Sequence, residues 1–385
     1  MRSVYMDHSA TTPVREEVVE AMMPYLGREF GNASSLHSVG RRAHDALEES
    51  RQTMAALLGA SPPEIIITSG GTESDNLAIV GAVEAAGGKG HVITSAVEHH
   101  AVLNTCEALA KRGLEVTYLP VDEDGMVDPA DLENALREDT VLVNIMTANN
   151  EVGAIEPIAE LAAAAAAASV PFHTDAVQAA GKIPVDVDEM GIDMMSVSAH
   201  KFYGPKGVGL LYVRGGTRIV PRQYGGHHED GRRAGTENIA GIVGMARALE
   251  LACAEMDSEA PRLRRLRDRL QEGLLERVEG SRLNGHRERR LPHLLNVTFE
   301  NVEGESVLLS LDALGIAVST GSACSSGTLE PSHVLIAMGV PKETVHGSVR
   351  FSLGRINTED DVDHVLDNLP PVIERLRQMS PFVTG

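Results

Sequence analysis

The chain has 385 residues, enough for two domains or for one large domain with an appendage. Hydrophobic residues make up 43% and charged residues 23% of the sequence, which is typical of a soluble globular protein and excludes a disordered, fibrous or membrane class. The net charge of −21 and the absence of tryptophan disfavour nucleic acids and membranes as partners.

Short β-branched runs alternate with helical patterns in the first half of the chain. The predicted strands are IIITS at 65–69, HVITS at 91–95, VTYLP at 116–120, VLVNIM at 141–146 and FHTDA at 172–176. The alanine-rich run at 161–169 predicts a helix. This alternation indicates an α/β fold with a largely parallel sheet, and ligands of such sheets bind at the carboxyl ends of the strands.

The pattern changes at about residue 256. An arginine-rich helical stretch is followed by LLNVTFE, a predicted helix at 303–314, a loop containing a cysteine, and VRFSL. We therefore predict a large domain at residues 15–255 and a smaller α+β domain formed by residues 1–14 and 256–385.

Two polar segments follow the first predicted strands. TSGGTESDN at 68–76 places glycines and Thr72 at the start of a helix, where backbone N–H groups favour a phosphate, although an ordinary turn and N-cap would look the same. SAVEHHAVL offers His99 and His100, and a neutral imidazole there could stack on a pyridine ring or be a structural histidine.

Two further segments carry an acid and an amine. Asp175 in FHTDAVQAAGK could pair with a protonated ring nitrogen or cap a helix, and Gln178 shares its helical face. Lys201 in SVSAHKFYGPKG lies beside His200 and could form a Schiff base, although most lysines are exposed. Pyridoxal phosphate would explain these groups together.

The cysteines favour a thiol function over a metal or disulfide function. Cys106, Cys253 and Cys324 are odd in number and fit no CxxC spacing, which predicts reduced thiols in the cytoplasm. Cys324 lies among small residues in TGSACSSGT, which predicts a surface loop and a candidate reactive thiol, the alternative being an inert one. The adjacent histidines in GGHHED lack supporting ligands, so we predict no metal site.

The first residues contain no continuous apolar segment, and we expect neither a signal peptide nor a membrane anchor.

Taken together, the motifs resemble those of the cysteine desulfurases, fold-type I pyridoxal-phosphate enzymes of the class V aminotransferase type. The resemblance covers nearly the whole chain, through YMDHSATTPV, FGNASSLHSVGRRA, TSGGTESDN, EHHAVL, NNEVGAIEPI, HTDAVQAAGK, SAHKFYGPKGVGLLYVR, RAGTEN, STGSACSSGTLEPSHVL and VRFSLGR. It implies a large domain with a mostly parallel seven-stranded sheet flanked by helices, and a smaller α+β domain.

The resemblance also implies residue roles. Lys201 would be the Schiff-base lysine, Asp175 the partner of the ring nitrogen, His99 the stacking imidazole and Gln178 the donor to the ring hydroxyl oxygen. The phosphate would be held by Gly71, Thr72, Ser198 and His200, and by Thr236 of the neighbouring subunit, which implies a homodimer. The substrate carboxylate would be bound by Asn150, Arg350 and Asn32, and Cys324 would be the nucleophile.

The implied reaction converts L-cysteine to L-alanine and leaves a persulfide on Cys324 for an acceptor, such as an iron–sulfur scaffold protein or the tRNA thiolation machinery. The segment around Cys324 resembles the longer-loop, housekeeping and nitrogen-fixation branch. Ala199 departs from the glycine common in close relatives, and the C-terminal end offers no clear docking motif.

The rival hypotheses are another class V enzyme, such as a selenocysteine lyase or an aminotransferase, and a silent scaffold. The cysteine within TGSACSSG and the presence of Lys201, Asp175 and His99 favour the desulfurase.

Overall fold

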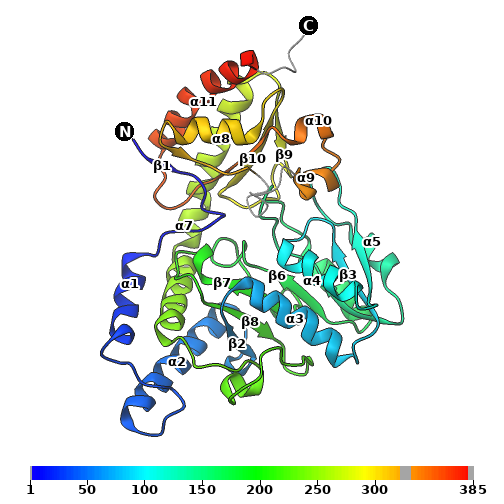
Figure 1. Cartoon of the computed structure of the whole chain (residues 1–385), viewed down its shortest axis with the longest axis vertical. Coiled ribbons are helices and arrows are strands. Elements are labelled where there is room, and N and C mark those ends of the chain that lie inside the picture. Colours follow the sequence, from blue (N-terminus) through cyan, green and yellow to red (C-terminus); the bar gives the residue numbers. More distant parts are fainter. Residues whose placement is uncertain (1, 321–330, 380–385) are drawn as a thin grey trace.

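The computed structural model describes residues 2–320 and 331–379. Figure 1 shows a helix-covered sheet in the lower part of the molecule and a smaller group of strands and helices above it, with the long helix α7 (Ile239–Arg277) running through both. The predicted nucleophile, Cys324, lies outside the described residues.

Seven strands form the main sheet, in the order β2-β8-β7-β6-β5-β3-β4. Their bounds are β2 Ile65–Thr68, β3 His91–Ser95, β4 Glu115–Leu119, β5 Thr140–Asn144, β6 Phe172–Asp175, β7 Met194–Ser198 and β8 Gly209–Val213. Strand β8 is antiparallel to both of its neighbours, and the other pairs are parallel. The predicted strands and the mostly parallel seven-stranded sheet are confirmed.

Helices cover both faces of this sheet because successive strand residues point to opposite sides. Ile66 packs in one buried cluster with α3 and α4, whereas Ile65 and Ile67 pack in another with α2, α6 and α7. The helices of this part are α1 Glu16–Met22, α2 Ser38–Leu57, α3 Gly71–Ala85, α4 His100–Ala110, α5 Pro129–Ala135 and α6 Ile158–Ala167. Residues 161–167 of the alanine-rich run lie in α6, which confirms the predicted helix, and the helix ends before residues 168 and 169. No helix within the described ranges is long and apolar enough to span a membrane.

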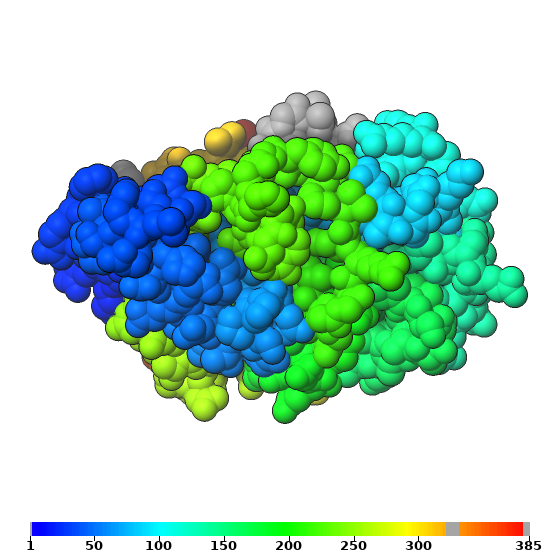
Figure 2. Space-filling view, turned by 90° about the horizontal axis from the view of Figure 1, so that it is seen from below, coloured from blue at the N-terminus to red at the C-terminus, as the bar shows by residue number. Residues whose placement is uncertain are grey.

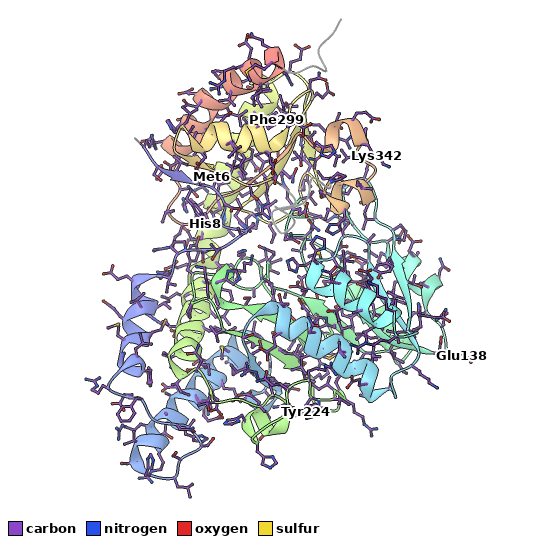
Figure 3. All side chains as sticks on the ribbon, in the orientation of Figure 1. Met6, His8, Glu138, Tyr224, Phe299 and Lys342 are labelled. Atoms are coloured by element: carbon purple, nitrogen blue, oxygen red, sulfur yellow. The ribbon has the colours of Figure 1, made fainter. Side chains whose placement is uncertain are left out.

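The upper part has its own hydrophobic core, to which Met6 and Phe299 contribute (Figure 3). Strands β9 (Ser281–Asn284), β10 (Leu294–Phe299) and β12 (Ser348–Ser352) form an antiparallel sheet, and β1 (Val4–Tyr5) pairs with β11 (Ile316–Ala317). The helices here are α8 Gly304–Asp312, α9 His333–Ala337, α10 Lys342–Val345 and α11 Glu359–Met379. The predicted domain boundary at 255 lies within α7, and the division stays a prediction.

A buried ion pair fixes the strand that leads to α3. Glu229 accepts hydrogen bonds from Arg51 Nη1 at 2.7 Å and Nη2 at 3.0 Å, and from the backbone N–H of Ile67 at 2.9 Å. We expect Glu229→Gln to lower the free energy of unfolding by about 3 kcal/mol, because it removes the buried counter-charge of Arg51 and leaves the guanidinium only the partly exposed Glu48, at 3.2 Å. Chemical denaturation measures the change.

Glu250→Gln is the matched control for Glu229→Gln. The Arg247–Glu250 pair has a distance of 2.5 Å but is exposed, so solvent screens it. The control should change the free energy of unfolding by no more than about 0.5 kcal/mol. Equal effects of the two substitutions would refute the stabilising role of the buried pair.

Candidate active site

The predicted site residues converge on the sheet edge where β2, β3, β5, β6 and β7 end, because the carboxyl ends of parallel strands share one edge. A cavity of about 320 Å³ lies there. The predicted residues that line it are Gly71, Thr72, His99, Asn150, Asp175, Gln178, Ser198, His200, Lys201 and Arg350. Asn32 and Thr236 are exposed and do not line this cavity.

Lys201 ends the short 3₁₀ helix Ala199–Lys201, directly after β7. Its Nζ donates hydrogen bonds to the backbone oxygens of Ser9, at 2.6 Å, and Ala10, at 2.9 Å. The neighbouring Ala199 is fully buried and packs against Gly204, where an added Cβ would lie 2.8 Å from the Ala199 Cβ. Gly204 therefore gives the extra methyl group of Ala199 its space.

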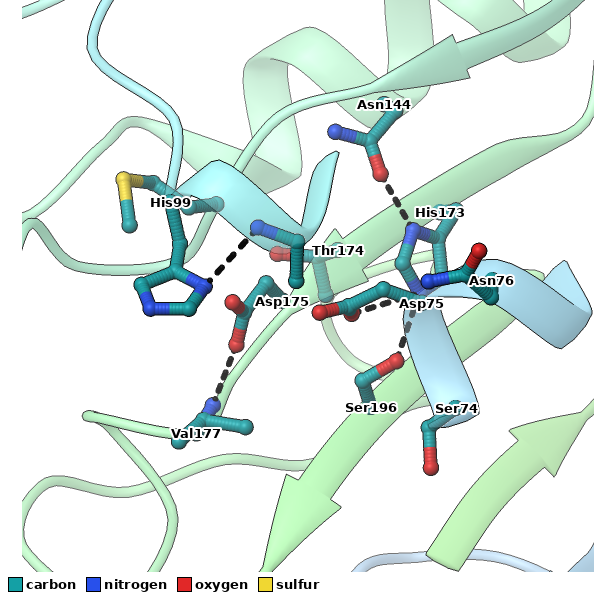
Figure 4. A network of polar contacts seen from close by, with 12 residues as sticks. Ser74, Asp75, Asn76, His99, Asn144, His173, Thr174, Asp175, Val177 and Ser196 are labelled. Carbon is teal, nitrogen blue, oxygen red and sulfur yellow. Dashed lines mark hydrogen bonds and ion pairs between the residues drawn. The ribbon is translucent and has the colours of Figure 1, made fainter. Parts of the chain in front are cut away.

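Asp175 lies at the carboxyl end of β6, and its Oδ1 accepts a hydrogen bond from the backbone N–H of Val177 at 2.8 Å (Figure 4). Burial raises the pKa of Asp175 to about 6. Asp75 of α3 lies behind it, and burial followed by the charge of Asp175 raises the pKa of Asp75. Both carboxyl groups line the cavity, and a cation placed beside Asp175 would favour its ionisation.

His173 occupies the same polar network (Figure 4). Its Nε2 lies 2.9 Å from the Ser196 Oγ, and its Nδ1 contacts the Asn144 Oδ1. Burial lowers the pKa of His173 to about 3, so the ring is neutral at physiological pH. His173 therefore supplies no positive charge beside Asp175, and the positive charge of Lys201 partly offsets the effect of burial on the pKa of Asp175.

His99 caps helix α4, because its Nδ1 accepts a hydrogen bond from the backbone N–H of Ala101 at 3.1 Å. Burial, and then the positive charge of Lys201, lowers the pKa of His99 to about 4. The ring is therefore neutral near pH 7 and carries its proton on Nε2. A neutral ring at the cavity wall suits stacking on a flat aromatic ligand.

Glu98 anchors the turn that carries His99. Its Oε1 accepts hydrogen bonds from the Ser95 Oγ at 2.7 Å and the Met146 backbone N–H at 2.9 Å. Burial raises the pKa of Glu98 from 4.5 to about 8. Between these values the unfolded chain releases the proton that the folded chain keeps, so the contribution of Glu98 to stability falls as the pH rises through this window.

Glu98→Gln removes this titration. We therefore expect the stability of the variant, relative to the unsubstituted protein, to increase as the pH rises from about 5 to about 8. Chemical denaturation across this range measures the difference. Glu107→Gln, an exposed position on α4, is the control and should show no comparable pH dependence. A pH-independent difference for Glu98→Gln would contradict the shifted pKa.

Helix α3 begins at the cavity, and the N–H groups of a first helical turn have no partner within their own helix. Gly70 at its N-cap has a φ of 150° and provides no side chain to cap the first turn. An added Cβ on Gly209 would lie 2.6 Å from the Gly70 Cα, so β8 can approach this turn closely because residue 209 is a glycine. The N–H groups of Gly71 and Thr72 and the hydroxyl of Ser198 form a donor set suited to a phosphate.

Arg350 reaches the cavity from β12. Its Nη1 donates to the backbone oxygen of Asn150 at 2.8 Å, and its Nη2 lies 2.9 Å from Asp7 Oδ1. Its buried Nε has no hydrogen-bond partner among the described residues. The guanidinium is thus fixed in place with a donor left for an anion such as a carboxylate.

These groups fit pyridoxal phosphate by the chemistry of the donor set. An amine, a buried carboxylate, a neutral imidazole and a phosphate-type helix start surround one cavity of suitable size for a small cofactor.

Sequence reasoning missed several neighbours of these groups. They are the backbone oxygens of Ser9 and Ala10, the carboxylates of Asp7 and Asp75, the amine of Lys182 and the Glu73–Arg233 ion pair, at 2.7 Å, which ties the RAGTEN segment to α3. Ser9 and Ala10 lie in the motif YMDHSATTPV, but a backbone acceptor has no residue signature. The other contacts join residues far apart in sequence.

Known proteins match the chain over nearly its full length. The family model of class V aminotransferases matches residues 4–365. The protein described as cysteine desulfurase IscS of Dictyoglomus turgidum is 57% identical over 382 residues, which are 99% of this chain and 97% of that protein.

Solved structures share the fold. A structure described as a NifS-like protein is 40% identical, has a TM-score of 0.92, and the match covers 97% of this chain and 100% of that one. A structure described as SspA in complex with cysteine is 38% identical, has a TM-score of 0.82, and the match covers 91% of this chain and 99% of that one.

Proposed function

Because the chain belongs to the cysteine desulfurases of the class V aminotransferase family, whose members depend on pyridoxal phosphate, we propose that it takes sulfur from L-cysteine and releases L-alanine. The observation that carries the proposal is the single cavity that collects Lys201, Asp175 and His99 at the sheet edge. The similar structure described with bound cysteine supports the choice of substrate. The comparisons do not favour a different class V reaction.

The described residues would hold the cofactor as follows. Lys201 would bind its aldehyde carbon, His99 would stack on the ring, Asp175 would face the ring nitrogen and Gln178 the ring hydroxyl oxygen. Gly71, Thr72, Ser198 and His200 would hold the phosphate, together with Thr236 of a second subunit. When bound, pyridoxal phosphate withdraws electrons from the substrate Cα and stabilises negative charge there.

The chain's own residues would then act on the substrate. Arg350 and Asn150, with Asn32 as a further candidate, would bind the carboxylate of L-cysteine and orient its Cα toward Lys201. The Lys201 amine, displaced from covalent attachment, would take the α-proton and return a proton to the product. The position of its Nζ at the cavity wall supports this role.

Cys324 would carry the sulfur. Its thiolate would attack the substrate sulfur, so that an S–S bond forms while the C–S bond breaks and the carbon gains a proton. L-cysteine and the Cys324 thiol thus give L-alanine and a Cys324 persulfide. Cys106 suits the role poorly, because burial raises its pKa to about 12, and burial also raises the pKa of Cys253.

A single-turnover experiment tests the function. The purified protein, loaded with pyridoxal phosphate, is mixed with L-cysteine without reductant, and we expect one equivalent of alanine and a persulfide located on Cys324 by mass spectrometry. Cys324→Ala should abolish the persulfide, and Cys253→Ala is the matched control that should retain it. Bound cofactor without alanine would refute the desulfurase.

A second copy of the chain and a sulfur acceptor are the proposed partners. The face in Figure 2 combines N-terminal segments, in blue, with segments coloured green. Large exposed apolar side chains in these regions support a homodimer, and they are Val19, Met23, Leu26, Phe30, Leu36 and Tyr224. Light scattering would distinguish the dimer from a monomer. The acceptor would be a protein such as an iron–sulfur scaffold, and the cytoplasmic location stays a prediction.

A further inference from the structure

A second lysine lies behind the wall of the candidate active site. Lys182 follows the turn at Gly181, after the segment that carries Asp175 and Gln178. It lines a separate cavity of about 50 Å³, to which His8, His293 and Lys201 also contribute. Figure 3 shows His8 where the N-terminal segment passes between the two parts of the molecule.

The surroundings of Lys182 are unusual for a lysine. Its Nζ donates a hydrogen bond to the Gln178 Oε1 at 3.0 Å, and within the described residues no carboxylate forms a salt bridge with it. Burial, followed by the positive charges of Lys201 and Arg350, lowers the pKa of the Lys182 amine. A buried amine without a counter-charge is unfavourable for folding. The presence of Lys182 at this position therefore points to a functional role for its hydrogen bond with Gln178.

Two contacts fix which way the amide of Gln178 points. The backbone oxygen of Ser9 can only accept, and it lies 3.0 Å from the Gln178 Nε2, so the NH₂ group must face it. The Oε1 then faces Lys182, whose amine donates in either charge state. One N–H of Gln178 is used by Ser9, and the second remains for the cavity that Gln178 lines.

We propose that Lys182 is a positioning residue, which holds the amide oxygen of Gln178 away from the cavity so that an amide N–H is presented to the ring hydroxyl oxygen of the cofactor. The inference rests on the proposed function, since it assigns the ligand of that N–H. Lys182 acts through Gln178 and does not itself touch the ligand.

The test is a double-substitution cycle on the full-length protein, with pyridoxal phosphate as the probe. Lys182→Met, Gln178→Ala and the double variant are compared for the dissociation constant of pyridoxal phosphate and for the pH midpoint of its absorption band. We expect each single substitution to weaken binding about 3- to 10-fold and to shift the midpoint, which is the effect of one lost hydrogen bond. The double variant should be no weaker than Gln178→Ala alone.

Additional variants separate positioning from packing. Lys182→Gln keeps an N–H donor and should recover part of the binding, and Lys111→Met, at an exposed position after α4, should have no effect. The inference would be overturned if Lys182→Met left binding and the midpoint unchanged, or if the effects in the double variant were fully additive. Either result would leave the proposed function intact. An unsubstituted protein that does not bind pyridoxal phosphate would overturn the proposed function and this inference together.

Discussion

Lys201→Ala is expected to reduce alanine formation from L-cysteine by at least ~10³-fold, since it removes both the covalent attachment of the cofactor and the proton-transferring amine. Lys201 lines the cavity, and its Nζ donates hydrogen bonds to two backbone oxygens. The substitution therefore removes an amine that is held in a defined position at the site. A steady-state alanine assay measures the loss, and the altered absorption of the bound cofactor reports the missing attachment.

Lys206→Ala is the matched control for this loss. Lys206 lies five residues further on in the same glycine-containing segment and is exposed, so its replacement should leave turnover within about twofold. If Lys201→Ala kept more than about a tenth of the turnover of the unsubstituted protein, Lys201 would not be the catalytic amine.

Asp175→Asn is expected to lower turnover by about 10² to 10³-fold while leaving the protein folded. A neutral amide of the same shape cannot stabilise a protonated ring nitrogen, and loss of one partner from a buried charge pair has an effect of this size. The carboxylate is buried and already hydrogen-bonded to Val177, so little else in the network must change. Turnover and the absorption spectrum of the bound cofactor provide the measurement.

Asp193→Asn is the control for Asp175→Asn. Asp193 Oδ2 accepts a hydrogen bond from the backbone N–H of Phe172 at 2.8 Å, at the opposite end of β6 from Asp175. An asparagine oxygen can keep this bond, so turnover should be unchanged. Equal losses in the two variants would indicate a general effect on β6 and would remove the argument for a specific role of Asp175.

Much of the site could be predicted because its residues follow strands. Thr72, His99, Asp175 and Lys201 each lie at or soon after the end of a strand, and a parallel sheet brings the carboxyl ends of its strands to one edge. The roles assigned to them came from the resemblance to a family, because position at a strand end is compatible with several cofactors and with ordinary helix caps.

The supporting contacts could not be predicted in this way. The Ser9 backbone oxygen, which accepts from both Lys201 and Gln178, has no side-chain signature. The pairing of Asp7 with Arg350 joins positions separated by most of the chain, and only folding brings β12 to the N-terminal segment.

The sequence by itself determined the α/β class, the order of strands and helices, and the set of polar residues at the strand ends, because these depend on local periodicity and on turns. The tertiary structure alone decided the burial and partners of those residues. Burial in a common cavity sets the pKa values of Asp175 and His99, and the N-terminal segment and Lys182 fix the orientation of Lys201 and Gln178. Such effects depend on distances between groups that the linear sequence does not contain.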